Sequence, residues 1–140
     1  MKKLPFILIV VCMLVLPYSV NATSFDGSKP LICAMMKAME CTPEDGCEEV
    51  TVESINVSQF VKIDFKKKEI TAINTDKKTP IEHMEHVDGK IIIQGAEEGI
   101  EGIRDGVGWT AAIAEDTGKM IVTASGEQVG FVIFGACTEK

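Results

Sequence analysis

Alternation between apolar and polar side chains runs through most of this chain, from residue 47 to its end. Val61, Ile63 and Phe65 alternate with polar residues, and this period of two is typical of strands that bury one face. Asp88-Gly89 separates two such runs and is the strongest two-residue signal for a hairpin turn. The pattern therefore predicts short antiparallel strands joined by tight turns.

Three hairpins and a central last strand follow from this pattern. The expected segments are 61–65 with 70–72, 80–87 with 90–94, and 109–113 with 119–124, and then Val129 to Cys137. About seven strands in this order form an antiparallel meander, which closes into a small barrel or folds over as a sandwich. No long linker and no repeat interrupts it, so we expect one domain.

Residues 29–40 follow a different period and indicate a helix. Ser28 can cap its start, and Pro30 lies in the first turn, where its missing N–H costs nothing. Apolar residues then recur at spacings of three and four, at Leu31, Ile32, Met35, Met36 and Met39. Pro43 and Gly46 end the segment. The sequence thus predicts one N-terminal helix beside the sheet, in a mainly β (α+β) fold.

The first 22 residues have the pattern of a secretory signal peptide. Lys2-Lys3 gives a positive start, Leu4–Leu16 is almost unbroken apolar sequence, and Val20–Ala22 offers small residues where a signal peptidase reads them. Pro17 interrupts the apolar run before the roughly 20 residues that a membrane anchor needs. We therefore expect cleavage before Thr23 and a periplasmic or secreted protein without a stable membrane anchor.

The predicted mature domain, residues 23–140, is strongly acidic. It holds all 21 acidic residues of the chain and 12 of its 14 basic ones, which gives a net charge of −9. This balance opposes binding to nucleic acid and to anionic membrane surfaces, because both need a basic surface. It keeps the protein soluble, and it suits a cationic partner such as a basic protein.

Four cysteines remain after cleavage, Cys33, Cys41, Cys47 and Cys137, and an even number in a small exported domain indicates disulfides. On a helix, Cys33 and Cys41 would lie about 12 Å apart, beyond the roughly 7 Å that a disulfide allows. This excludes Cys33–Cys41. Of the two remaining pairings we favour Cys41–Cys47, which would close the turn at residues 42–46, with Cys33–Cys137 joining the helix to the last strand. The alternative is Cys33–Cys47 with Cys41–Cys137. No CxxC pair is present, so the pattern does not favour zinc.

A glycine-rich stretch, residues 95–108, holds five glycines and predicts a long loop, and such loops in compact domains are often functional. Glu101 and Arg104 lie in it. Trp109, the only tryptophan, follows where the loop enters a strand. We take these three as candidate binding residues. Trp109 would either wall a ligand mouth, anchor a partner or close one end of the core.

The other reactive residues match no catalytic or cofactor motif. His83 and His86 lie three apart on a predicted strand, so their side chains point to opposite faces and cannot share a metal ion. The acidic residues of the 95–108 stretch do not follow an EF-hand spacing. No Gly-x-Ser-x-Gly or P-loop motif is present. We therefore expect no cofactor, and an enzyme built on this chain would have to use carboxylates.

Four segments resemble a family of small exported bacterial proteins without an assigned function. They are Phe25–Leu31, Gly108–Thr110, Thr117–Met120 and Gly130–Cys137. The resemblance covers nearly all of residues 25–138 and implies export and one domain, but no active site. The expected plan is also similar to that of small periplasmic barrels, among them lipocalin-like carriers of apolar ligands and proteins that plug the active sites of lysozymes.

These observations favour a non-enzymatic binding protein for a small apolar ligand or a protein partner. One alternative is an acidic inhibitor of a cationic enzyme, similar to lysozyme inhibitors, because its charge would steer it to the target. Another is an enzyme with a carboxylate-based site. The interior separates the first two, because a carrier needs a hollow apolar interior whereas an inhibitor needs a filled core and a protruding loop.

Overall fold

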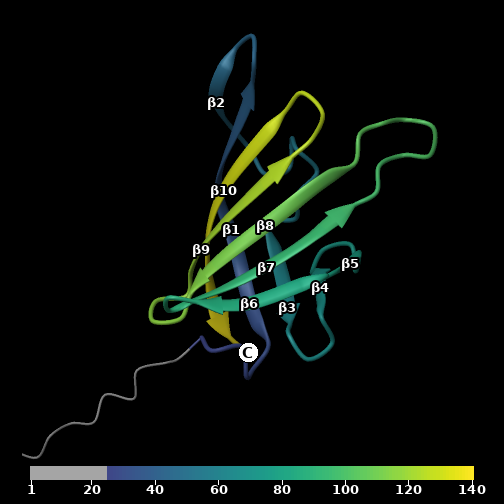
Figure 1. The fold of residues 1–140 in the computed structure, drawn as a ribbon. Helices are drawn as coiled ribbons and strands as arrows, with labels where there is room; N and C mark the ends of the chain where they lie inside the picture. The colour runs from purple at the N-terminus through teal and green to yellow at the C-terminus, as the bar shows by residue number, and fades with distance from the viewer. Residues whose placement is uncertain (1–24) are drawn as a thin grey trace, which may run out of the picture.

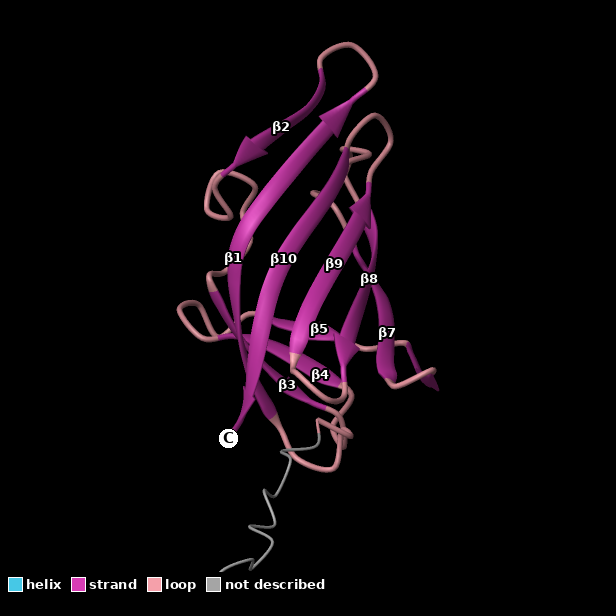
Figure 2. Ribbon diagram, turned by 90° about the vertical axis from the view of Figure 1, so that its left-hand side faces the viewer, coloured by secondary structure: helices cyan, strands magenta, loops and turns pink. Residues whose placement is uncertain are grey.

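A computed structural model describes residues 25–140 and shows them as a curled antiparallel sheet (Figures 1 and 2). The strands are β1 (Leu31–Thr42), β2 (Gly46–Val50), β3 (Phe60–Asp64), β4 (Glu69–Ala72), β5 (Lys78–Pro80), β6 (His83–Val87), β7 (Lys90–Glu97), β8 (Val107–Ala114), β9 (Lys119–Ser125) and β10 (Gly130–Glu139). Their order is β5-β4-β3-β1-β10-β9-β8-β7-β6, with β2 also paired to β1. No helix long and apolar enough to cross a membrane occurs within these residues. The predicted signal peptide, residues 1–22, lies outside them.

The mainly β prediction is confirmed, and so are the three predicted hairpins. They are β3–β4, β6–β7 and β8–β9, each an antiparallel pair of consecutive strands. Asp88 and Gly89 both have positive φ, 48° and 69°, as the predicted two-residue turn requires. β10 is central, between β1 and β9. The sheet curls into a half-barrel, and it has ten strands where the sequence predicts about seven, because β1, β2 and β5 are additional.

The predicted N-terminal helix is wrong, because residues 31–42 form β1, the longest strand. Leu31, Cys33 and Met35 alternate as buried positions, and the register with β10 then shifts at Met36, which stands in a bulge. The next buried residue is Ala38. A bulge inserts one extra residue and shifts the buried face by one position. Of the five apolar residues that predict the helical stripe, only Leu31 and Met35 are buried, and Met36 is 68% exposed. The helical spacing in the sequence therefore does not correspond to one buried face.

Strand partners on both sides explain why β1 is not helical. β10 pairs with it along nearly its whole length, while β3 pairs with residues 31–34 and β2 with residues 38–42 on its other side. The methionines, alanines and charged residues of β1 favour a helix locally. Pairing on both edges outweighs that local preference, since propensity is a weak influence beside tertiary context.

Both predicted disulfides are confirmed. Cys33 on β1 lies directly opposite Cys137 on β10, with the two Cα atoms 3.9 Å apart. Cys41 lies opposite Cys47 on β2, with a Cα separation of 4.0 Å. The helix geometry used to exclude a Cys33–Cys41 disulfide is absent, but in the observed strand these two cysteines are even further apart. Eight residues of extended strand span about 26 Å.

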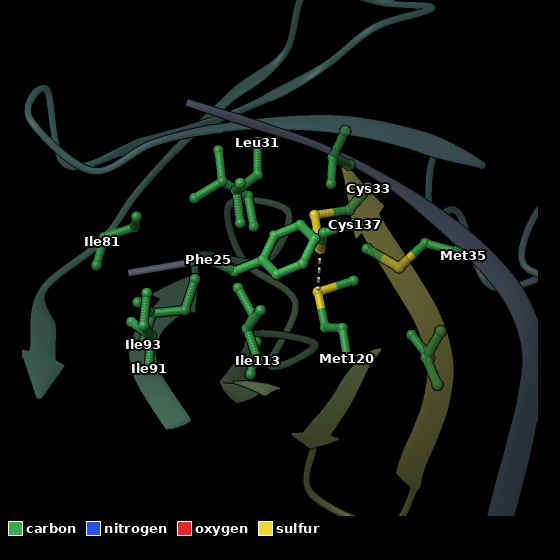
Figure 3. Close-up of a cluster of buried hydrophobic side chains, with 14 of the residues drawn as sticks. Phe25, Leu31, Cys33, Met35, Ile81, Ile91, Ile93, Ile113, Met120 and Cys137 are labelled. Carbon is green, nitrogen blue, oxygen red and sulfur yellow. Dashed lines mark hydrogen bonds between the residues drawn. A yellow bond between two sulfur atoms is a disulfide. The ribbon is translucent and has the colours of Figure 1, made fainter. Parts of the chain in front are cut away.

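The concave face of the sheet carries the core, which is filled by side chains from β1, β3, β7, β8, β9 and β10 (Figure 3). Leu31, Ile91, Ile93 and Ile113 are 0% exposed. A side chain that lined a cavity large enough for water would keep accessible surface on that side. No cavity large enough for water therefore adjoins these side chains.

Sulfur atoms and the segment before β1 complete this core. Met120 places its Sδ 3.9 Å from the Sγ of Cys137, a packing contact because a disulfide sulfur carries no proton (Figure 3). Phe25 is buried against the same region, and its N–H donates to the carbonyl of Glu115 at 2.9 Å. Gly118 has φ of +67°, and a Cβ there would lie 2.8 Å from the Phe25 ring. Glycine is thus needed where Phe25 closes this end.

The chain between β5 and β6 brings the two ends of the curled sheet together. The N–H of Ile81 donates to the carbonyl of Lys68, in the β3–β4 turn, at 2.8 Å. The next residue, Glu82, donates its N–H to the carbonyl of Gln94 on β7 at 2.9 Å. Two adjacent residues therefore connect the first and the last parts of the strand order.

The two disulfides are expected to differ in their contribution to stability. Cys33–Cys137 closes a loop of 104 residues and Cys41–Cys47 one of 6, and the longer loop constrains the unfolded chain more. The double variant Cys33→Ala/Cys137→Ala should lose about 2–5 kcal/mol of unfolding free energy, and Cys41→Ala/Cys47→Ala, the matched control, should lose less. Urea denaturation of the oxidised proteins measures both. A larger loss from the Cys41–Cys47 pair would contradict this ranking.

Candidate functional site

The β7–β8 loop, residues 98–106, projects beyond the end of the sheet (the long green loop in Figure 1). It is shorter than the glycine-rich stretch, because Gly95 lies within β7 and Gly108 within β8. The loop leaves the same end of the sheet as the β1–β2 hairpin. Strand direction requires this, because β1 and β7 end where β2, β8 and β10 begin.

Hydrogen bonds within the loop give it a defined shape. The N–H of Ile103 donates to the carbonyl of Ile100 at 2.8 Å, and Gly102 between them has φ of +85°, as the third residue of a type II turn requires. The carboxylate of Asp105 accepts the N–H of Ile100 at 2.8 Å. A Cβ on Gly99 would lie 1.8 Å from that carboxylate. The loop therefore contains a hydrogen-bonded turn that the Asp105 carboxylate stabilises.

Two isoleucines stand exposed on this turn. Ile100 is 65% exposed and Ile103 is 58% exposed. Glu98 and Glu101 beside them are exposed as well. An apolar pair at the tip of an ordered projection, surrounded by carboxylates, is a surface suited to contact with another molecule.

The structure places two of the three predicted binding residues in this loop. Glu101 occupies the second position of the turn, next to Gly102. Arg104 is exposed and lines a shallow depression of about 360 Å³ together with Gly106, Gly126 and Glu127. The depression lies between the loop and the β9–β10 turn, and its lining is polar or glycine.

Trp109, the third predicted residue, lies in the sheet rather than at the loop tip. It lies on β8 directly opposite Gly95 of β7, and its half-buried side chain packs against the core. A Cβ on Gly95 would lie 2.5 Å from Cζ2 of the indole, so the ring rests directly on the glycine. The indole Nε1 is covered and has no hydrogen-bond partner among the described residues. These contacts are typical of a residue that covers the core, here at the end of the sheet from which the 98–106 loop projects.

Glu97, at the end of β7, ties the base of the loop to β5. Its carboxylate accepts hydrogen bonds from the ammonium of Lys77 and the hydroxyl of Thr79. Burial raises the pKa of Glu97, but these two hydrogen bonds and the charge of Lys77 outweigh burial and hold the pKa below its usual value. Glu97 is thereby kept ionised, and its contacts fix where the loop leaves the sheet.

The β1–β2 hairpin forms a second, acidic projection (top of Figure 2). Its exposed carboxylates are those of Glu44, Asp45, Glu48 and Glu49. Lys37 forms an ion pair with Glu49 at 2.7 Å. This one positive charge does not balance the four carboxylates, so the hairpin remains negative. The Cys41–Cys47 disulfide crosslinks its strands. Carboxylates are thus concentrated at the end of the sheet from which the 98–106 loop projects.

The two histidines occupy opposite faces of β6, as the sequence predicts. On the neighbouring strand β7, Gln94 lies opposite His83 and Ile91 lies opposite His86. His86 places its Nδ1 2.6 Å from a carboxylate oxygen of Glu115. Within residues 25–140 no group of three or more histidine, cysteine, aspartate or glutamate side chains is arranged to hold a metal ion.

No protein-family model matches the chain, and no curated protein or solved structure matches it. The resemblance to a family of small exported bacterial proteins therefore stays a prediction. The similarity in plan to lipocalin-like carriers and to lysozyme inhibitors stays a prediction as well.

Trp109 can be tested as a core residue by truncation. Trp109→Ala should lose about 3 kcal/mol of unfolding free energy, the low end for a large aromatic, because part of the ring is exposed. Trp109→Phe is the matched control and should lose less, since it keeps a ring on Gly95 and removes an N–H that has no partner. Urea denaturation followed by far-UV circular dichroism measures both variants. An alanine variant as stable as the wild type would show that Trp109 does not support the core.

Proposed function

We propose that the mature protein is an exported, non-enzymatic binding protein that recognises a cationic protein through its 98–106 loop. The exposed pair Ile100 and Ile103, held on an internally hydrogen-bonded turn, is the observation that carries this proposal. The proposal retains the protein-partner form of the sequence prediction. Export itself is supported by the signal-peptide pattern and by the two disulfides.

The filled interior supports a protein partner over a small apolar ligand. A carrier encloses its ligand in a cavity of several hundred Å³ lined mainly by apolar side chains. The positions that would line such a cavity hold Leu31, Ile91, Ile93 and Ile113, which have no accessible surface. The depression of about 360 Å³ is open and is lined by Arg104, Glu127 and two glycines, so no large apolar side chain lines it.

The loop has the chemistry of a binding tip. Removing one isoleucine side chain from water stabilises a complex by about 1.5–3 kcal/mol. A loop already fixed by the Asp105–Ile100 and Ile103–Ile100 hydrogen bonds loses little conformational freedom on binding. The carboxylates of Glu98 and Glu101 would meet the basic rim of a partner.

Charge supports a cationic partner at the same end of the molecule. The mature chain carries a net charge of −9, and the acidic β1–β2 hairpin projects beside the loop's end of the sheet. Complementary potentials speed the encounter of two proteins and disfavour wrong partners. An anionic surface around an apolar tip therefore suits a basic protein with an apolar cleft.

A special form of this proposal is the inhibition of a cationic enzyme. The same tip would enter the active-site cleft of the enzyme, and the filled core would serve only as a rigid support. The projection of the loop beyond the sheet favours this form (Figure 1).

Loop substitutions test the proposal, with a cationic lysozyme as the first probe. Ile100→Ser/Ile103→Ser should weaken binding by at least about tenfold, which corresponds to 1.4 kcal/mol, without lowering the melting temperature, because both side chains are exposed. Ile121→Ser is the matched control, since Ile121 is 46% exposed on β9, away from the loop. Calorimetric titration at low and high salt measures affinity, and high salt should weaken it.

Each outcome of this titration decides one part of the proposal. A wild-type protein that binds no lysozyme at low salt would overturn the lysozyme-inhibitor form. A double variant that binds a cationic protein as tightly as the wild type does would overturn the role of the loop.

A further inference from the structure

β6 is an open edge of the sheet. It stands last in the strand order and pairs only with β7 (Figure 1). All five of its residues are exposed. An edge strand presents unpaired N–H and C=O groups that can bond a further strand. β6 is therefore a surface on which another strand can add.

The hairpin turn determines which backbone groups of β6 face the open edge. Asp88 and Gly89 form a two-residue turn, and Val87 lies opposite Lys90 across it. The residues that flank such a turn are a hydrogen-bonded pair, and bonded and non-bonded pairs alternate along an antiparallel ladder. Val87 and the second residue before it, Glu85, therefore direct their backbone groups to β7. Met84 and His86 direct theirs to the open edge.

Two other strands at the margins of this sheet carry features that oppose pairing. β2 has Glu48-Glu49 at its centre, so an antiparallel pairing of β2 with itself brings carboxylates together. β5 has three residues, ends in Pro80 and is tied to β7 through Glu97. Charges and prolines on edge strands are common protections against pairing. The sequence of β6, His83-Met84-Glu85-His86-Val87, has neither a proline nor a run of like charges.

We propose that β6 pairs antiparallel with β6 of a second copy of this chain, with Met84 opposite Met84 of the partner subunit. In this register His83 lies opposite Glu85 of the partner subunit, and two-fold symmetry repeats the pair. Residues opposite one another share a face of the sheet, so the imidazole and the carboxylate can meet. A ring N–H can donate to the carboxylate in either protonation state.

The open backbone groups and the charges select this register. The backbone groups of Met84 face the open edge, so each allowed register changes the sum of the two paired residue numbers by two. In the Met84 register the two Met84 residues bond each other, whereas His86 lies opposite Glu82 of the partner subunit, whose N–H already donates to Gln94. The next register in one direction places Glu85 opposite its own copy, which brings like charges together. The Met84 register instead places an imidazole opposite a carboxylate and covers Met84, which is 37% exposed.

This dimer is independent of the proposed partner binding. The paired residues 83–87 lie against positions 90–94 of β7, and the 98–106 loop begins after the end of that strand. A dimer would thus carry two free loops.

Sedimentation of the mature protein over a concentration series tests the dimer. The wild type should show a monomer–dimer equilibrium. Met84→Pro removes the N–H that faces the open edge and spares the β6–β7 ladder, so this variant should remain monomeric. Met84→Ala, the control, keeps the N–H and should still form dimers. A wild-type protein that stays monomeric at millimolar concentration would overturn the proposal, and so would a folded proline variant that forms dimers.

A charge exchange tests the register even if the proline variant does not fold. His83→Glu places glutamate opposite Glu85 of the partner subunit, twice, and should weaken the dimer by about tenfold. Adding Glu85→His to this variant restores opposite partners and should restore the dimer. A single variant with unchanged dimerisation, or a double variant that is not rescued, would overturn the pairing of His83 with Glu85 of the partner subunit.

Discussion

The pairing of β1 with β10 holds the two halves of the sheet together. β2 and β3 attach to one side of β1, and β9, β8 and β7 follow β10 on the other side. The Cys33–Cys137 disulfide crosses this pair within the core, where Cys33 has no accessible surface. Segments more than a hundred residues apart in sequence are thereby fixed side by side. The curl of the sheet, and with it the closure at Ile81 and Glu82, depends on this junction.

The curl of the sheet gives a concave face that is filled by the core, so a binding surface has to lie outside it. Branched side chains from β7 and β8 meet Leu31 and the disulfide across the interior (Figure 3). Phe25 is hydrogen-bonded to Glu115 at the β8–β9 turn, and Trp109 lies near the start of β8 and packs against the core. The proposed binding function therefore rests on what projects from the sheet, namely the 98–106 loop with its two isoleucines and the acidic β1–β2 hairpin. A rigid, packed sheet is a suitable base for such projections, because it fixes their positions without moving itself.

Local signals in the sequence were sufficient for some elements and not for others. Asp88-Gly89 and the alternating runs predict the β6–β7 hairpin. The even number of cysteines predicts two disulfides, and the structure decides between the favoured pairing and its alternative. β1 carries apolar residues at helix-like spacings, yet only Leu31 and Met35 among them are buried, and strand pairing on both edges outweighs this local pattern. β2 and β5 were missed because one is acidic and the other is three residues long with a proline. Ile100 and Ile103 had a readable signal, two isoleucines within a polar, glycine-rich loop, whereas the open edge at β6 requires the strand order.

The proposed binding function depends on a closed interior, and methyl-resolved NMR of the isoleucine side chains reports on that interior residue by residue. The mature protein is titrated with a long-chain fatty acid as the apolar probe. We predict that the signals of Ile91, Ile93 and Ile113 do not move, because neighbouring side chains cover them completely. Saturable shifts of those three signals would show that the interior opens to an apolar ligand, and would contradict a protein that binds through its loop alone.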